Sequence, residues 1–209
     1  MSDNIRVGLI GYGYASKTFH APLIAGTPGM ALAAVSSSDA AKVHADWPSV
    51  PVVSEPKHLF NDPNIDLIVI PTPNDTHFPL AKAALEAGKH VVVDKPFTVT
   101  LSQARELDAL AKSLGRLLSV FHNRRWDSDF LTVKRILSEG TLGEILFFES
   151  HFDRFRPQVR NRWREQAGPG SGIWYDLAPH LLDQAVNLFG LPVSMTVDLA
   201  QLRPGAQTT

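Results

Sequence analysis

The sequence contains no cysteine, which excludes several classes of protein at once. Without thiols the chain cannot carry a disulfide framework, a cysteine nucleophile or a thiolate zinc site. It also lacks a long apolar run, because the longest aliphatic stretches, Leu67–Ile70 and Val91–Val93, are far too short to cross a bilayer. The first residues are charged where a signal peptide would be apolar. We therefore expect a cytoplasmic protein with no membrane partner.

An excess of charge of one sign is missing as well. The 209 residues include 20 Lys and Arg against 21 Asp and Glu, so the formal net charge is −1. A nearly neutral chain has no overall attraction to nucleic acid or anionic lipid, and we expect neither as a partner. Apolar residues make up 44% and charged residues 20%, as in ordinary globular proteins with a core. The length predicts one or two domains.

Aliphatic runs alternate with helical patterns over the first 122 residues. The runs have no polar alternation, so they indicate strands that are buried on both faces. Their alternation with helices predicts parallel βαβ units and an α/β sheet covered on both sides. Gly88 and Gly115 mark the ends of two of the helices. The predicted strands are 5–10, 30–35, 50–53, 66–70, 91–93 and 117–121, and the predicted helices are 16–25, 75–87 and 101–114.

The pattern changes near residue 122. Two helices and two strands are predicted beyond it, at Asp127–Ser138, Asp176–Phe189, Ile145–Phe155 and Met195–Leu202. Pro179 is acceptable in the second helix because it falls in the predicted first turn. Two strands rarely form a stable sheet by themselves. We therefore expect residues 123–209 to form an incomplete α+β domain.

A glycine-rich turn, Gly11-Tyr12-Gly13-Tyr14-Ala15-Ser16, lies between the first predicted strand and the first predicted helix. Gly11 permits a tight turn, Gly13 lets the backbone approach a pyrophosphate, and the helix N-terminus offers free N–H groups to phosphate. Ser16 stands at the third glycine position, which needs a small residue. We interpret residues 1–122 as a doubly wound dinucleotide-binding domain of the Rossmann type. A glycine turn that binds no ligand is the alternative.

The end of the second predicted strand bears on the choice of cofactor. NAD-binding sites present an Asp or Glu there, which hydrogen bonds the ribose 2′-hydroxyl. This sequence has Ser36, Ser37 and Ser38 instead, followed by Lys42, so hydroxyls and a cation would meet a 2′-phosphate. The nearby Asp39 can simply cap the next helix. The pattern favours NADP over NAD.

Two short patterns carry groups suited to proton transfer. Lys95, in Asp94-Lys95-Pro96, follows a buried strand where partial desolvation suits a proton relay; a strand-terminal Lys that reaches solvent is the alternative. Asp176 and His180 are four residues apart on one helix face. A His oriented by a carboxylate is a general base near neutral pH, and a structural His is the alternative. Spacing typical of metal ligands is missing, so we expect no metal.

His77 and a run of arginines each leave two interpretations open. His77 follows a predicted strand end, where it either contacts a cofactor or buttresses a helix. The charge balance and the lack of a nucleic-acid motif argue against RNA as the partner of the arginines. We expect them to form a solvated loop or a subunit contact, with one or two at the substrate. These five arginines within eleven residues are Arg154, Arg156, Arg160, Arg162 and Arg164.

Five short motifs follow one another along the chain, and their order is more specific than any single residue. They are Gly-Tyr-Gly-Tyr (11–14), Pro-Thr-Pro-Asn-Asp-Thr-His (71–77), Asp-Lys-Pro (94–96), His-Asn-Arg-Arg-Trp-Asp (122–127) and Tyr-Asp-Leu-Ala-Pro-His-Leu-Leu-Asp (175–183). Together they resemble the Gfo/Idh/MocA oxidoreductases, the family of glucose–fructose oxidoreductase and inositol dehydrogenase. Tyr-Gly-Tyr, Phe-His-Asn-Arg-Arg-Trp and Arg-Trp-Arg-Glu are most similar to its NADP-dependent scyllo-inositol dehydrogenases.

The resemblance implies a dehydrogenase that moves a hydride between a secondary alcohol of a polyol, inositol or sugar and NADP, with NAD as the other cofactor. In the family, the histidine that matches His180 is the acid/base for the substrate hydroxyl. The aspartate that matches Asp176 orients it, and the lysine that matches Lys95 bridges substrate and cofactor. Asp94 replaces the usual Glu of the family, and Ala178 replaces a glycine. A catalytically silent regulator that binds the cofactor, or an inactive fragment of such an enzyme, is the alternative.

The resemblance also implies a set of binding residues and a cis bond between Lys95 and Pro96. The family's second domain, which binds substrate and forms dimers, continues past this length. The chain therefore resembles a truncated member, and we expect a homodimer or larger assembly at full length. The implied cofactor contacts are Gly11, Gly13, Tyr14, Ala15, Ser36, Ser37, Ser38, Lys42, Pro71, Thr72, Asn74, His77, Asp94, Lys95 and Asn123. The implied substrate contacts are Lys95, Arg124, Trp163, Tyr175, Asp176 and His180.

Overall fold

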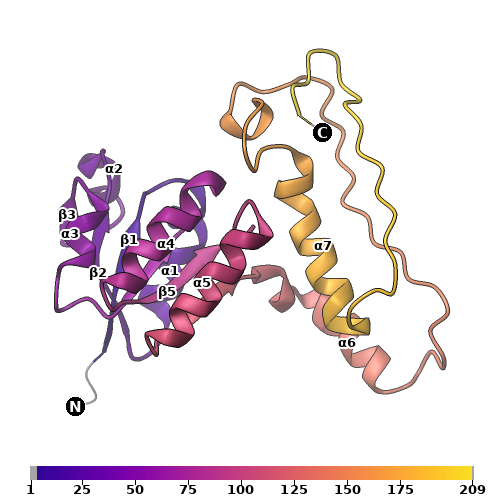
Figure 1. The fold of residues 1–209 in the computed structure, drawn as a ribbon, viewed down its shortest axis with the longest axis horizontal. Coiled ribbons are helices and arrows are strands. Elements are labelled where there is room, and N and C mark those ends of the chain that lie inside the picture. Colours follow the sequence, from indigo (N-terminus) through magenta and orange to yellow (C-terminus); the bar gives the residue numbers. More distant parts are fainter. Residues whose placement is uncertain (1–3, 209) are drawn as a thin grey trace. The chain divides into compact units, whose positions relative to one another are not determined.

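The computed structural model describes residues 4–208 (Figure 1). The chain forms two compact units, and the boundary between them in the sequence follows Phe121. The first unit contains a sheet with helices, and the second begins at His122 and contains helices and extended chain. The sequence places the domain boundary after residue 122, next to this division.

The first unit is built on six parallel strands in the order β3-β2-β1-β4-β5-β6. The direction of winding reverses between β1 and β4, as in dinucleotide-binding sheets, and ligands bind at the carboxyl ends of the strands near such a reversal. This order confirms the predicted Rossmann-type sheet. The strands are β1 (Ile5–Ile10), β2 (Met30–Ser36), β3 (Val52–Val53), β4 (Leu67–Ile70), β5 (His90–Asp94) and β6 (Leu118–Phe121).

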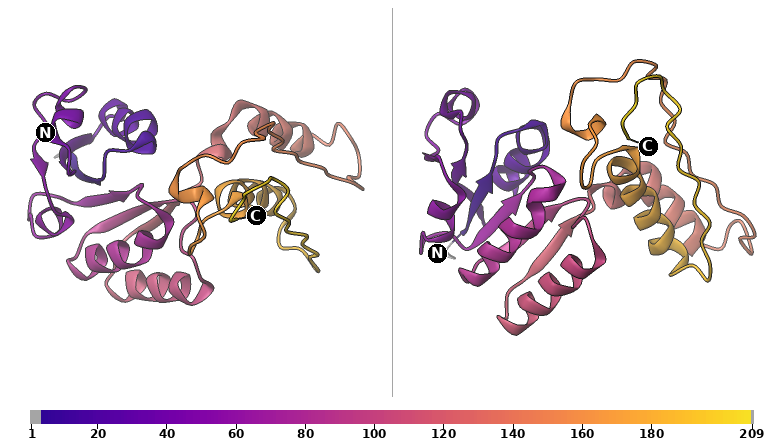
Figure 2. Two further views of the ribbon diagram at one scale, coloured as in Figure 1. Left: turned by 90° about the horizontal axis from the view of Figure 1, so that it is seen from above. Right: turned by 45° about the horizontal axis from the view of Figure 1, so that its top comes forward.

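Helices cover both faces of the sheet, and each face has its own apolar core. On one face α1 (Ala21–Gly26) and α2 (Ala40–His44) pack against Val7, Leu9 and Val69. On the other face α3 (Pro56–Phe60), α4 (His77–Glu86) and α5 (Leu101–Ser113) pack against Ile68 and Ile70. Figure 2 shows α4 and α5 together on one side of the sheet. The alternation of Ile68, Val69 and Ile70 between the faces explains why these strands are apolar throughout.

The long helices α4 and α5 end just before the glycines that the sequence marked as helix ends. Gly88 and Gly115 lie just beyond α4 and α5 with φ of 77° and 61°, the left-handed conformation that favours glycine at a helix end. α5 begins with a capping box in which the side chains of Thr100 and Gln103 bind each other's backbone N–H groups. The short helices α2 and α3 were not predicted, because five residues contain too little of a helical period.

The second unit contains two long helices. They are α6 (Ser128–Ser138) and α7 (Ile173–Phe189), accompanied by the single turns η3 (Asn123–Trp126) and η4 (Trp163–Glu165). α7 begins three residues before its predicted start at Asp176. The prediction that Pro179 lies in the first turn was therefore wrong. It lies in the second turn, where its missing N–H removes one helical hydrogen bond.

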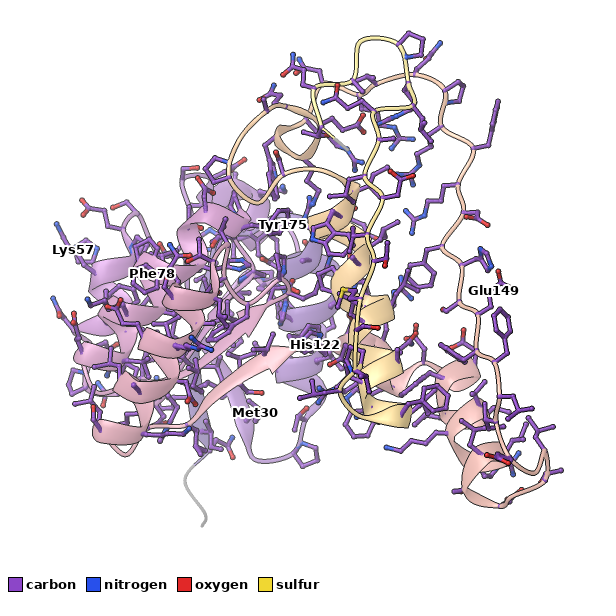
Figure 3. All side chains as sticks on the ribbon, turned by 45° about the vertical axis from the view of Figure 1, so that its right-hand side comes forward. Met30, Lys57, Phe78, His122, Glu149 and Tyr175 are labelled. Carbon is purple, nitrogen blue, oxygen red and sulfur yellow. The ribbon has the colours of Figure 1, made fainter. Side chains whose placement is uncertain are left out.

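The two strands predicted in the second unit are not strands in the structure. Residues 145–157 and 194–202 are extended, and Figure 3 shows side chains projecting from the first segment around the labelled Glu149. Within residues 4–208 neither segment takes part in a backbone ladder. A strand requires hydrogen-bonded neighbours, and the apolar sequence pattern alone does not supply them. In the described part of the chain, no helix is long and apolar enough to pass through a membrane.

The packing of α5 generates a stability test. Leu107 is 0% exposed and Leu101, in the same helix, is 65% exposed. Leu107→Ala should lower the free energy of unfolding by about 2–5 kcal/mol, because it removes buried methyl groups and leaves a cavity. Leu101→Ala should change it by less than about 0.5 kcal/mol. Urea unfolding measures both values, and equal losses would contradict the assignment of this face of α5 to the core.

Candidate active site

The glycine-rich turn is held against the end of β2. Gly11 has a φ of 79°, and its N–H donates to the carbonyl oxygen of Ser36 at 2.7 Å. A Cβ placed on Gly13 would meet no atom within 4 Å, so the outer side of the turn is open to a ligand. The carbonyl of Gly13 accepts from the N–H of Lys17 at 3.0 Å. This bond leads the chain into η1 (Ser16–His20), a single turn with π-helical hydrogen bonds.

A cleft of about 420 Å³ opens beside this turn. It collects seven of the predicted cofactor residues: Gly11, Gly13, Ser36, Ser37, Ser38, Lys42 and Thr72. Tyr12, Asp39 and Ser54 also line it and were not predicted as contacts. Ser54 directly follows β3, so its place at a strand end was the signal that could have found it. The cleft fits the adenosine end of a dinucleotide, since it joins the glycine turn to the end of β2.

Asp39 lines the cleft, but its carboxylate has a local partner. Its Oδ1 accepts from the N–H of Lys42 at 3.0 Å and caps α2, which confirms the capping interpretation. Ser37 Oγ accepts from the N–H of Asp39 at 3.1 Å. The hydroxyl of Ser37 therefore belongs to the turn that places the cap.

Tyr12 braces the glycine turn from the side of α2. Its hydroxyl donates to Asp46 Oδ2 at 2.9 Å, and Lys17 Nζ donates to Asp46 Oδ1 at 2.9 Å. The hydrogen bond from Lys17, followed by that from Tyr12, lowers the pKa of Asp46. Burial raises the pKa of Tyr12, and the nearby Asp46 raises it further. Tyr12 therefore stays a neutral hydrogen-bond donor, and the charged Asp46 fixes the turn on both sides.

The last three residues of the glycine-rich turn, Tyr14 to Ser16, differ in burial. Tyr14 is 77% exposed and lies edge-on to the ring of Phe19. Ala15 is half-buried, and Ser16 is buried at the third glycine position. Ser16 Oγ has no hydrogen-bond partner among the residues that the structure describes.

The carboxylate of Asp94, at the end of β5, is held by two neighbours. The N–H of Lys95 donates to its Oδ1 at 2.7 Å, and Nε2 of the buried His20 lies 3.3 Å from its Oδ2. Burial raises the pKa of Asp94, but the hydrogen bond and charge of His20 and the N–H and charge of Lys95 outweigh it, so the pKa is lowered. The predicted cis bond between Lys95 and Pro96 is confirmed. His20 was not predicted as a partner, because nothing in the sequence relates it to Asp94.

His77 connects the ends of β4 and β5. It is fully buried, its Nδ1 lies 2.8 Å from the carbonyl oxygen of Pro96, and its Nε2 lies 2.9 Å from that of Thr72. Burial lowers its pKa despite these two carbonyls, so the ring is neutral at pH 7 and donates to one of them. The geometry favours the buttressing role of His77 over contact with a cofactor. Asn74 is also buried, Pro71 and Thr72 are half-buried, and Thr72 Oγ1 lies 2.6 Å from Thr76 Oγ1.

In the second unit, α7 carries Tyr175, Asp176 and His180. Figure 3 labels Tyr175 near the start of this helix. His180 is only 6% exposed, and its ring lies 6.4 Å from that of Phe152. Asp176 Oδ1 lies 3.5 Å from Nε of Arg164, whose guanidinium lies over the ring of Trp163. Lys95 belongs to the first unit, so its joint action with Asp176 and His180 stays a prediction.

Asp183 has a structural partner rather than a place beside His180. Its two oxygens accept from Nε and Nη2 of Arg125 at 2.7 and 2.6 Å, and His122 Nδ1 lies 3.7 Å away. Gln184 Nε2 donates to the carbonyl of Arg124 at 3.1 Å. These bonds hold η3, which includes Asn123 and Arg124, against α7. The guanidinium of Arg124 binds Asp127 at 2.7 Å and lies over the ring of Phe152.

Comparison with models of known protein families shows which family the chain belongs to. Residues 5–122 match the model of the oxidoreductase family with an NAD-binding Rossmann fold, and residues 130–209 match the GFO/IDH/MocA C-terminal domain. The chain belongs to the Gfo/Idh/MocA oxidoreductase family. The resemblance read from the five motifs is thereby confirmed.

Three relatives show how far the similarity extends. An uncharacterized oxidoreductase of Escherichia coli (strain K12), YdgJ, is 89% identical over 209 residues, which are 100% of this chain and 60% of YdgJ. The NADP(+)-dependent scyllo-inositol 2-dehydrogenase IolW of Bacillus subtilis is 41% identical over 99% of this chain and 58% of its own length. The solved structure of the YPO2259 putative oxidoreductase from Yersinia pestis is 74% identical, with a TM-score of 0.93 over 100% of this chain and 59% of that one. The chain thus spans about 60% of the length of these relatives.

The surroundings of Asp94 generate a prediction for the pH dependence of stability. Because its pKa is lower in the folded state, the ionised carboxylate stabilises the fold above the unfolded value of about 4, and this stabilisation is lost as pH falls through the folded pKa. Asp94→Asn should therefore lower the free energy of unfolding most at pH 7 and least near pH 3. Urea unfolding between these values measures it. Asp108→Asn, an exposed ion-pair partner of Lys112, is the control. A deficit of Asp94→Asn that does not change with pH would contradict the assignment.

Proposed function

We propose that this protein is an NADP-preferring dehydrogenase that interconverts a secondary alcohol and a ketone of a polyol, inositol or sugar. The observation that carries the proposal is the cleft that joins the glycine turn to Ser36, Ser37, Ser38 and Lys42. The similarity to IolW, an NADP(+)-dependent scyllo-inositol 2-dehydrogenase, supports both the cofactor and the substrate class. The cytoplasmic location of the present protein, and its assembly at full length into a homodimer or larger oligomer, stay predictions.

The chemistry of the cleft supports NADP over NAD. The end of β2 presents hydroxyls where NAD sites present a carboxylate, and Lys42 supplies a cation for a 2′-phosphate. Asp39 Oδ1 accepts from the N–H of Lys42, so this carboxylate caps α2. The open outer side of Gly13 and the inward hydrogen bond of Gly11 leave room for a pyrophosphate.

The family's mechanism gives the residues of this chain their proposed roles. When bound, NADP supplies the nicotinamide carbon that gives or takes the hydride. A ring nitrogen of His180 takes the proton of the substrate hydroxyl, Asp176 orients His180, and Lys95 bridges the substrate and the cofactor. Tyr175, Arg124 and Trp163 are the remaining proposed substrate contacts. Positioning of the two reactants supplies much of the acceleration.

Cofactor preference can be measured directly by calorimetric titration. The parent protein should bind NADP about tenfold or more tightly than NAD, because a hydrogen bond between charged groups is worth about that factor. Ser37→Asp should reverse the preference, since its carboxylate can still accept from the N–H of Asp39 while repelling a 2′-phosphate. Ser102→Asp, in the first turn of α5 and outside the cleft, should leave both affinities unchanged. Equal affinities in the parent would contradict the preference.

The role of His180 can be tested by steady-state kinetics. His180→Asn should lower kcat by about 10²–10⁴-fold, the usual contribution of a general base. The affinity for NADP should not change, because the glycine turn lies in the first unit. His151→Asn, an exposed histidine of the same unit, should keep the parent kcat. A His180→Asn enzyme with the parent kcat from about pH 6 to 9 would remove His180 from the mechanism and leave Lys95 as the acid/base candidate.

A further inference from the structure

Two neighbouring cavities in the second unit share an arginine-rich wall. The larger has a volume of about 350 Å³ and the smaller about 110 Å³. Both are lined by Arg154, Arg156, Ile173 and Arg203. The smaller cavity is also lined by Asp176, the candidate orienting carboxylate on α7. The arginine wall therefore reaches the region in which the substrate is proposed to bind.

The carboxylates near this wall neutralise only part of its charge. Glu165 binds Arg162 Nε at 2.9 Å and Arg203 Nη1 at 3.0 Å. Asp176 lies 3.5 Å from Arg164, which does not line either cavity. Within residues 4–208, no carboxylate forms an ion pair with Arg154 or Arg156. The wall thus presents two guanidinium groups that are not ion-paired within these residues, with the charge of Asp176 acting on Arg156 from a greater distance.

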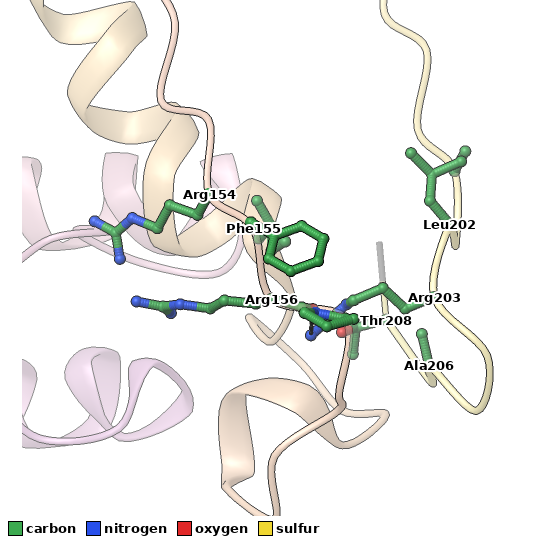
Figure 4. Close-up of a pocket in the computed structure, with 10 residues that line it drawn as sticks. Arg154, Phe155, Arg156, Leu202, Arg203, Ala206 and Thr208 are labelled. Atoms are coloured by element: carbon green, nitrogen blue, oxygen red, sulfur yellow. Dashed lines mark hydrogen bonds between the residues drawn. The ribbon is translucent and has the colours of Figure 1, made fainter.

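The extended backbone points both of these groups the same way. Residues two apart in an extended chain project to the same side. Figure 4 shows Arg154 and Arg156 projecting together, with Phe155 on the opposite side. Loss of solvent lowers the pKa of Arg156, and the nearby guanidinium groups of Arg154, Arg160 and Arg162 lower it further. The charge of Asp176 opposes them but does not outweigh them. An anion would relieve this repulsion, and planar guanidinium groups match the oxygens of a carboxylate or phosphate.

We propose that Arg154 and Arg156 bind an anionic group of the substrate beside Asp176, so that the substrate class is an acidic sugar or polyol, either a sugar acid or a sugar phosphate. This inference rests on the proposed dehydrogenase function and narrows its substrate. The whole chain is nearly neutral, so it has no overall attraction for an extended polyanion.

The binding arm of the test does not depend on activity. Inorganic phosphate is titrated calorimetrically into the parent chain, the double variant Arg154→Gln/Arg156→Gln and the control Arg160→Gln. The control removes one positive charge from the same segment, at a residue that lines neither cavity. The parent and the control should bind phosphate alike, and the double variant should bind about 10- to 100-fold more weakly. If the double variant does not fold, Arg154→Lys, which keeps the charge but loses the planar fork, should give a smaller loss. Equal binding by all variants, or no binding by the parent, would overturn the proposal.

The kinetic arm separates the two claims. The kcat/KM values for glucose 6-phosphate and gluconate are compared with those for glucose and the inositols, using the same proteins. The proposal expects a preference for one anionic compound, which also identifies carboxylate or phosphate as the recognised group, and a loss of about 10- to 100-fold on that compound alone in the double variant. Turnover of neutral compounds with no effect of the double variant would overturn the anion site and leave the dehydrogenase standing. Phosphate binding that depends on Arg154 and Arg156, without any turnover, would overturn the dehydrogenase and leave the anion site standing.

Discussion

The candidate cofactor site depends on the central position of β1, which is hydrogen bonded to β2 on one side and to β4 on the other. This pairing sets the carboxyl ends of the strands along one edge and places the reversal of winding beside the glycine turn. The side chain of Ile68 in β4 packs closely over Gly8 in β1. A Cβ on Gly8 would lie 3.0 Å from Ile68 Cδ1, so a larger residue there would displace β4 or the side chain of Ile68. The cleft therefore follows from the sheet order as much as from the glycines.

Hydrogen bonds beneath the strand ends keep this edge in place. His77 lies between the carbonyls of Thr72 and Pro96 and donates to one of them, and Asp46 accepts from Tyr12 and Lys17. None of these bonds uses the open side of Gly13, so a ligand can bind there without breaking the frame. A pre-formed frame lowers the cost of ordering the site when a cofactor binds.

The sequence predicted the sheet and the glycine turn, but it could not predict the side-chain pairs that support them. Apolar runs and glycine stops are local signals, and they located all six strands of the first unit. The pairing of His20 with Asp94 joins residues 74 apart, which no local pattern encodes. In the second unit the apolar residues of 145–155 and 195–202 suggested strands, yet strand formation depends on neighbours that local patterns do not reveal. Asp183, three residues beyond His180 in the sequence, binds Arg125 and anchors η3, a pairing between residues 58 apart that no local pattern encodes.

Oxidation of a hydroxyl compound by bound NADP is the central claim, and the appearance of NADPH measures it most directly. The protein is mixed with NADP and a panel of inositols, aldohexoses, polyols and their acidic derivatives, and NADPH is followed by its near-ultraviolet absorbance. The account predicts that NADPH forms with at least one member of the panel, and more slowly when NAD replaces NADP. A protein that binds NADP but neither forms NADPH from any of these alcohols nor consumes it with the matching ketones would contradict the account.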